Sequence, residues 1–186
     1  MSEHSATAAF GGGCHWCTEA VFQHVDGVTR VEQGFAASAP PDDALSEAAL
    51  VTWDERAVGL GELIGVHLDT HAAGSDHALR AKYRSAVYVM SDRQGEAARR
   101  FLAAEAALRG PLVTRVMPLV RFELSPERYH DYYRRRPDAP FCRTHIAPKL
   151  ARMGRGPAAA SARPGPAPLI DESVTVPPVR KADRSV

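Results

Sequence analysis

Hydrophobic and polar positions divide the first ~150 residues into short strands and amphipathic helices. Runs of β-favouring residues predict strands over residues 7–10, 28–37, 46–53, 85–90 and 113–124, the last broken or edged at Pro118. Apolar residues at helical spacing predict helices over 15–24, 61–70 and 92–108, with Asp92 as the cap of the third helix and Gly110-Pro111 after its end. Ser125 and Pro126 predict a further short helix, with Ser as N-cap and Pro at the first helical position.

The order of these elements favours a mixed sheet. Strands and helices interleave, but no helix separates the strands over 28–37 and 46–53. We therefore expect an α+β fold, a two-layer sandwich with a mixed sheet and a ferredoxin-like core, rather than a doubly wound parallel fold.

The composition of the chain changes near Gly154. From Pro157 onward the sequence holds six of the 14 prolines and no aromatic residue. Such a stretch buries too little apolar surface to offset its ordering entropy. We expect one folded domain over residues 1–154 and a disordered, Pro/Ala-rich tail over residues 155–186.

Charge and composition exclude several classes of function. The chain has 186 residues, with 23 Lys+Arg against 22 Asp+Glu and a formal net charge of +1. This balance predicts no nucleic-acid partner, and no apolar run approaches the ~20 residues that span a bilayer. The start of the chain lacks a basic, apolar secretion pattern, so we expect a cytoplasmic protein. We also expect a monomer.

The segment around Cys14 is the strongest candidate for a reactive site. Gly11, Gly12 and Gly13 follow a short strand, and Cys14 stands where the next helix begins. Free N–H groups and the positive dipole end of a helix stabilise a thiolate, which matters because an ordinary thiol is only a few per cent ionised at pH 7. The pattern predicts a reactive cysteine.

The residues alone leave three interpretations of this loop open. Cys14 is a nucleophile, or Cys14 and Cys17 form a redox dithiol, or both cysteines bind zinc with a histidine. The zinc interpretation is the weakest, because the sequence offers no second close Cys/His pair to complete four ligands.

Several motifs in order resemble one known family. They are Gly13-Cys14-His15-Trp16, Glu19-Ala20-Val21-Phe22, Ser46-Glu47, Trp53-Asp54, Tyr83-Arg84-Ser85, Tyr129-His130-Asp131, Pro140-Phe141-Cys142 and Ile146-Ala147-Pro148-Lys149-Leu150. Together these segments, spread over residues 7–153, are similar to the peptide methionine sulfoxide reductases of the A type. The resemblance implies thiol-dependent reduction of methionine S-sulfoxide, free or in peptides, as protein repair under oxidative stress.

The resemblance also implies roles for particular residues. The Cys14 thiolate would attack the sulfoxide sulfur while Glu47, as the acid, protonates the oxygen. Tyr83 would hydrogen-bond the substrate oxygen, and Trp16 would pack on the substrate methyl group. The thiol would leave the reaction as a sulfenic acid, which condenses with a second thiol.

Two cysteines are candidates for that second thiol. Cys142, in a Pro-rich segment that could swing, is the first choice because the family commonly uses a cysteine from this block, and Cys17 is the second. The resulting disulfide needs an external dithiol, thioredoxin or dithiothreitol in vitro, and no bound cofactor is expected.

The chain departs from the family pattern around the expected substrate pocket. His15 replaces a phenylalanine, Phe35 replaces a tyrosine, and Ala78 stands where the family has an aspartate that Asp76 or His77 could replace. We expect His15, Trp16, Phe35, Asp76 and His77 to contact substrate. These changes imply retained sulfoxide chemistry with an altered choice of substrate.

Two further hypotheses remain at this point. The first is a thiol–disulfide oxidoreductase that uses Cys14 and Cys17. The second is a redox sensor or binding module that has lost turnover. Separately, the basic run Arg134–Arg136 is interpreted as complementing a helix dipole, with thioredoxin docking as the alternative.

Overall fold

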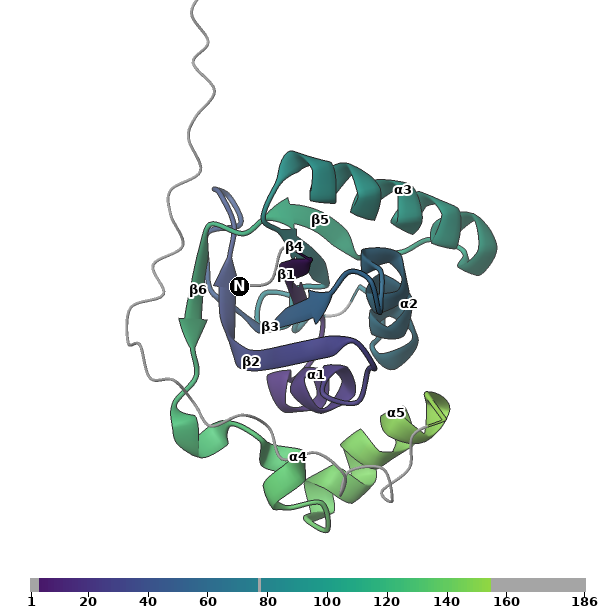
Figure 1. Cartoon of the computed structure of the whole chain (residues 1–186). Coiled ribbons are helices and arrows are strands. Elements are labelled where there is room, and N and C mark those ends of the chain that lie inside the picture. Colours follow the sequence, from purple (N-terminus) through teal and green to yellow (C-terminus); the bar gives the residue numbers. More distant parts are fainter. Residues whose placement is uncertain (1–3, 77, 155–186) are drawn as a thin grey trace, which may run out of the picture.

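The computed structural model describes residues 4–76 and 78–154 (Figure 1). The strands are β1 (Ser5–Gly11), β2 (Val28–Ala37), β3 (Ser46–Asp54), β4 (Ala86–Val89), β5 (Arg115–Pro118) and β6 (Arg121–Leu124). The helices are α1 (His15–Phe22), α2 (Leu60–Thr70), α3 (Asp92–Arg109), α4 (Tyr132–Arg135) and α5 (Ala147–Arg152). A 3-10 turn, η1 (Glu127–Tyr129), and a π-helical turn, η2 (Cys142–Ile146), lie near α4 and α5 in sequence.

The six strands form one mixed sheet in the order β5-β4-β1-β3-β2-β6. Its centre, β4-β1-β3-β2, is antiparallel and has the strand order of a ferredoxin-like βαββαβ unit. Only the β4–β5 pair is parallel among the described residues. The predicted α+β fold with a mixed sheet and ferredoxin-like core is confirmed.

The sheet curls so that its two edges approach each other. Only Leu119 and Val120 separate β5 from β6, which are the two edge strands. Three Cα–Cα steps cover at most about 11 Å, so the edges must lie close together. The Leu119 N–H donates to Val89 O and the Val120 N–H donates to Ala37 O (2.9 and 3.0 Å), which ties this link to β4 and β2.

Each face of the sheet has its own core. The face beneath α1, α2 and α3 buries the larger side chains, among them Phe10, Trp53 and Ile64. The inside of the curl is built mainly on small residues, Ala9, Ala36, Ala48 and Ala86, closed by Tyr88, Met117 and Leu119. Small side chains leave the room that close approach of the two edges requires.

A third core attaches the C-terminal segment to α1. Cys17, Ala20 and Val21 of α1 pack against Tyr133, Cys142, Ile146 and Leu150. Residues 130–152 therefore lie beneath α1, which Figure 1 shows with α4 and α5 below that helix.

Two details differ from the sequence predictions. The N-cap of α3 is Ser91, whose Oγ accepts the Gln94 N–H (3.3 Å), and Asp92 is the first helical residue. The short helix predicted after Ser125 is a three-residue 3-10 turn, η1, and Ser125 does not cap it: the N-cap is Pro126, and the Ser125 hydroxyl donates to Gln33 O (3.3 Å). A buried partner on β2 thus replaces the expected cap.

The predicted break at Pro118 is confirmed, since β5 ends there. The tail predicted over 155–186 lies outside the described residues.

Candidate active site

The glycine loop holds Cys14 at the start of α1. Cys14 is the N-cap residue, and its carbonyl accepts the N–H groups of Cys17 and Thr18 (3.0 and 3.2 Å). The turn is tight at Gly12, where an added Cβ would lie 2.5 Å from the His71 ring. The His71 ring is itself bonded to the Ser85 hydroxyl (2.8 Å). Glycine at position 12 therefore lets the loop lie against the end of α2.

The environment of Cys14 favours its thiolate. The Cys14 pKa is lowered chiefly by a hydrogen bond from the Cys17 thiol, with smaller contributions from the N–H groups of Trp16 and Cys17. The same contact raises the pKa of Cys17, which stays a protonated donor. Cys14 is half-buried, whereas Cys17 is buried. The first turn of α1 thus supplies one activated sulfur and one neutral thiol beside it.

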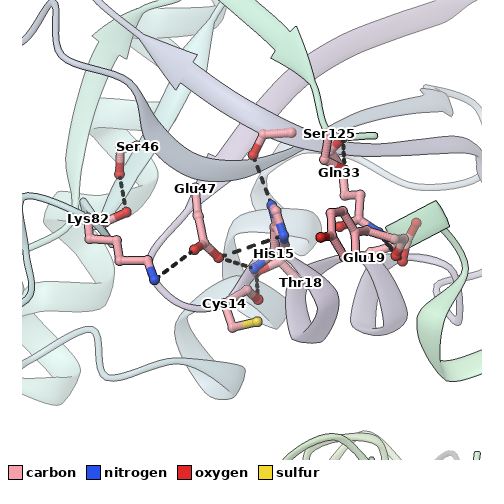
Figure 2. A network of polar contacts seen from close by, with 11 residues as sticks. Cys14, His15, Thr18, Glu19, Gln33, Ser46, Glu47, Lys82 and Ser125 are labelled. Atoms are coloured by element: carbon pink, nitrogen blue, oxygen red, sulfur yellow. Dashed lines mark hydrogen bonds and ion pairs between the residues drawn. The ribbon is translucent and has the colours of Figure 1, made fainter. Parts of the chain in front are cut away.

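Glu47 reaches the same place from the sheet. It is buried near the start of β3. The next residue, Ala48, pairs with Gly11, the last residue of β1. Its Oε2 accepts the backbone N–H of His15 (3.1 Å), and its Oε1 lies 3.5 Å from the Lys82 ammonium. Figure 2 shows the Glu47 carboxyl group between Lys82 and His15, above Cys14. The sheet and the helix start therefore place one carboxyl group beside the reactive thiol.

His15 has a fixed orientation beneath β2. It is 8% exposed, and its Nδ1 lies 3.2 Å from Gly34 O. Because a carbonyl only accepts, Nδ1 carries the proton and Nε2 presents a lone pair in the neutral ring. Nε2 lies 4.0 Å from Glu47 Oε2. Burial lowers the pKa of His15 below its usual range, so the ring is neutral at pH 7.

Lys82 connects Glu47 to Tyr83. The Lys82 ammonium lies 5.0 Å from the centre of the Tyr83 ring, and its pKa is raised chiefly by a hydrogen bond with Tyr83 and then by the Glu47 charge. The Glu47 N–H donates to Lys82 O (3.0 Å), which fixes this segment to β3. Sequence reasoning missed Lys82. Its one signal was its position just before the Tyr83 motif.

Aromatic rings surround the side of the site formed by Trp16. Its indole stacks on Tyr132 (centroids 4.3 Å apart, planes at 14°) and meets Phe141 edge-on at 5.5 Å. Phe35 lies opposite Glu47 in the β2–β3 register, with its ring 5.4 Å from the His15 ring. Trp16 therefore belongs to a wall built jointly with the C-terminal segment.

A buried carboxyl group ties that segment to α1. Glu19 accepts the Asp131 N–H (2.9 Å) and the Gln33 side-chain N–H (3.1 Å). Asp131 has a left-handed backbone (φ 54°), and its carboxylate accepts from Gln23 (2.8 Å). Burial raises the pKa of Glu19 to about 7. Glu19 thus fixes the turn that carries Tyr129 and Tyr132 beside Trp16.

Cys142 is already packed against α1 rather than lying on an exposed loop. It has no exposed surface and begins the π-helical turn η2. It shares a core cluster with Cys17, and Cys14 packs at the edge of that cluster. Burial raises its pKa. The three free thiols are therefore gathered around the N-terminal half of α1.

Of the two site residues predicted in the loop before Tyr83, the structure describes one. Asp76 is exposed, and its charge acts on the Arg80 guanidinium. His77 lies outside the described residues. Lys149, which sequence reasoning treated only as part of a motif, lines a small cavity with Gly13, Cys17 and His71. Its ammonium donates to Thr70 O.

The part of the chain that the structure describes offers neither a metal cluster nor a membrane-spanning helix. No three His, Cys, Asp or Glu side chains there are placed to share a metal ion. Among the same residues, no helix is both long and apolar enough to cross a membrane.

The fold and the site together define a class of protein. An activated thiolate at a helix start, a buried carboxyl group and two further thiols on an α+β scaffold are the parts of a cysteine-dependent oxidoreductase. The family model described as peptide methionine sulfoxide reductase matches residues 6–160. The chain belongs to the peptide methionine sulfoxide reductase family, and its reaction is the thiol-dependent reduction of methionine sulfoxide.

Curated relatives and solved structures agree with this family. A peptide methionine sulfoxide reductase MsrA of Halobacterium salinarum is 32% identical, over 79% of this chain and 93% of the relative. A peptide methionine sulfoxide reductase MsrA of Deinococcus radiodurans is 31% identical, over 78% of this chain and 79% of the relative. Methionine sulfoxide reductase A of Corynebacterium diphtheriae superposes with a TM-score of 0.62 at 22% identity, over 73% of this chain and 77% of that one. Reduced Mxr1 from Saccharomyces cerevisiae superposes with a TM-score of 0.66 at 19% identity, over 78% and 93%. Mxr1 has also been solved in complex with Trx2.

Proposed function

We propose that this protein reduces the S epimer of methionine sulfoxide with Cys14 as nucleophile and Glu47 as proton donor. One observation carries the proposal. The Glu47 carboxyl group accepts the backbone N–H of His15, the residue after Cys14, with 3.1 Å between His15 N and Glu47 Oε2. The carboxyl group therefore lies beside the position that the oxygen of a sulfoxide bound at the Cys14 sulfur would take.

The first step transfers oxygen from methionine sulfoxide to Cys14. The Cys14 thiolate forms a bond to the sulfoxide sulfur as Glu47 delivers a proton to the oxygen. The hydroxyl then moves to the Cys14 sulfur as the S–O bond and the new S–S bond break, so that the sulfoxide sulfur gains two electrons and leaves as methionine, and Cys14 becomes a sulfenic acid. The lowered pKa of Cys14 supports this role, because it raises the fraction of thiolate at neutral pH.

Neighbouring side chains complete the site. The Tyr83 hydroxyl supports the substrate oxygen and is oriented by Lys82, which also faces Glu47. The methyl group packs against Trp16 and Phe35. The neutral His15 ring lies beside them, with its Nε2 4.0 Å from Glu47 Oε2.

We propose the opposite order for the two resolving candidates. Sequence reasoning places Cys142 first. Cys17, however, lies one helical turn from Cys14, with its N–H on Cys14 O (3.0 Å), so we propose that Cys17 attacks the sulfenic acid first. That step forms the Cys14–Cys17 disulfide and releases the sulfenic oxygen as water.

Regeneration then consumes two electrons from outside the protein. Cys142 packs beside Cys17 and can exchange into the disulfide, after which thioredoxin reduces it and is itself oxidised. The solved complex of Mxr1 with Trx2 supports this partner. Because a reduced thioredoxin pool is required, we propose that the protein acts in the cytoplasm.

The direct test uses the separate sulfoxide epimers. With dithiothreitol as reductant, we expect turnover of the S epimer of free and peptide-bound methionine sulfoxide, little turnover of the R epimer, and none with Cys14→Ser. A Cys14→Ser protein that still consumes sulfoxide would overturn the proposal. Peroxide-driven oxidation of Cys14 without sulfoxide consumption would indicate a redox sensor instead.

A further inference from the structure

A pocket of about 400 Å³ opens beside Trp16, on the side of the C-terminal segment. Its lining combines three aromatic side chains with three arginines: Trp16, Tyr129, Tyr132, Arg128, Arg135 and Arg136. Pockets of this size suit a small ligand or one side chain of a peptide. The lining predicts a ligand that offers both an apolar contact and negative charge.

The positive charge of this pocket has no counter-charge within it. In the part of the chain that the structure describes, ion pairs to carboxylates are absent for Arg128, Arg135 and Arg136. The adjacent Arg134 is different, because it is paired with Asp131 (3.3 Å). The remaining lining residue, His130, donates from Nε2 to Ser125 O (2.7 Å) and supplies no negative charge.

Two of the three guanidinium groups are held by the segment itself. Arg128 lies over the Tyr129 ring (4.7 Å), and Arg135 donates to Glu127 O (3.4 Å). The dipole of α4 does not account for the basic run, because that helix has only four residues, Tyr132–Arg135. Unpaired, pre-positioned arginines are the usual recognition groups for carboxylates.

The pocket and the candidate active site share the wall formed by Trp16. Trp16 lies two residues after Cys14, and in the proposed function it contacts the methyl group of the sulfoxide. An extended peptide advances about 3.3 Å per residue, so residues next to the methionine sulfoxide leave the site over the Trp16 ring. Their side chains would then reach the pocket that Tyr129 and the arginines line.

We propose that this pocket is a substrate subsite that binds an acidic side chain close to the methionine sulfoxide of a peptide. The inference rests on the proposed function and adds a preference for acidic sequence context. It assigns Tyr129, Arg128, Arg135 and Arg136 to substrate recognition rather than to the reaction itself.

The test compares matched peptides with dithiothreitol as reductant. Each peptide carries one methionine S-sulfoxide and either two Asp or two Asn residues, placed before or after it. We expect kcat/KM to favour an Asp peptide by about tenfold at low salt, since surface ion pairs contribute modestly. The preference should shrink at high ionic strength, and Arg128→Gln/Arg135→Gln/Arg136→Gln should bring the ratio close to one.

Matched variants separate this subsite from general charge effects. Arg93→Gln/Arg99→Gln/Arg100→Gln removes the same charge from exposed positions on α3, which Figure 1 shows far from α4, and should keep the preference. Arg136→Gln alone serves if the triple variant folds poorly. If the ratio of kcat/KM between Asp and Asn peptides is unchanged in the Arg128/Arg135/Arg136 variants, the subsite is overturned. A change confined to the KM for thioredoxin overturns it as well and would indicate that the arginines dock the reductant. Turnover of the Asn peptides shows that the proposed function stands in either case.

Discussion

At the scale of single residues, the reactivity of Cys14 depends on contacts made within one helical turn. The Cys17 thiol and the free N–H groups at the start of α1 stabilise its thiolate against the desolvation that burial imposes. Glu47 comes from a strand instead, and its position depends on the His15 N–H and Lys82. The nucleophile is therefore a local product of sequence, whereas the acid depends on the sheet.

His15 gives a pH-dependent prediction at this scale. The ring is neutral at pH 7 because burial lowers its pKa, and it becomes a cation only as the pH falls below the usual histidine range. The charged and titratable groups that face it are Glu47, Lys82 and His130, and its Nδ1 faces the Gly34 carbonyl. In the wild type, an imidazolium formed at low pH would pair with the Glu47 carboxylate and oppose its role as proton donor.

His15→Phe removes that ionisation and leaves the backbone N–H that holds Glu47. We expect kcat/KM of the variant to stay within about tenfold of the wild type at pH 8 and to fall less steeply below pH 6.5. The measurement is the pH profile of kcat/KM with free methionine S-sulfoxide. Superimposable acid limbs for the two proteins would show that His15 takes no part in proton handling.

At the scale of elements, the junction between β1 and α1 depends on a close approach between Gly12 and His71. A Cβ on residue 12 would lie 2.5 Å from the His71 ring, whereas one on Gly13 would have open space. Gly12→Ala should therefore lower the free energy of unfolding by about 1–3 kcal/mol, the usual cost of overpacking, and Gly13→Ala by less. Urea unfolding of both variants checks this, and equal losses would contradict the packing argument.

Glu19 makes the link between α1 and the C-terminal segment sensitive to pH. Its pKa of about 7 in the folded protein lies above the ordinary 4.5. The stability that protonated Glu19 contributes is therefore fully present below pH 4.5 and is lost as the pH rises through 7. This contribution is on the order of 3 kcal/mol.

The corresponding measurement is the unfolding free energy between pH 5 and 8. The advantage of the wild type over Glu19→Gln should shrink by a few kcal/mol across that range. Glu96→Gln, an exposed change on α3, should run parallel to the wild type. A Glu19→Gln curve that also runs parallel would refute the assignment of this pKa.

At the scale of the whole molecule, the sequence predicts the ferredoxin-like core well. Strands over 28–37 and 46–53 and the helix over 61–70 match β2, β3 and α2 within one residue at either end, because their hydrophobic patterns are strong. The curl of the sheet was not predicted, since it follows from pairing at both edges. The Ser125 prediction failed for the same reason, because its partner, Gln33, is 92 residues away.

The candidate site was predictable only in part. The motifs brought out Cys14, Trp16, Glu47 and Tyr83, and the fold places the Cys14 loop, Glu47 and Lys82-Tyr83 together. The burial of Cys142 against Cys17, and the direction of the His15 ring, depend on contacts between distant segments. The same holds for the arginine-lined pocket, which exists only because the C-terminal segment packs beside Trp16.

The most direct test of the account is a single turnover without any reductant. Fully reduced protein is mixed with one equivalent of methionine S-sulfoxide, and the methionine formed, the free thiols that remain and the disulfides are measured by mass spectrometry. We expect one equivalent of methionine, the loss of two thiols, and Cys14 in every new disulfide at the earliest times, joined to Cys17. Methionine formed by Cys14→Ser, or formed by the wild type without loss of thiols, would contradict the account.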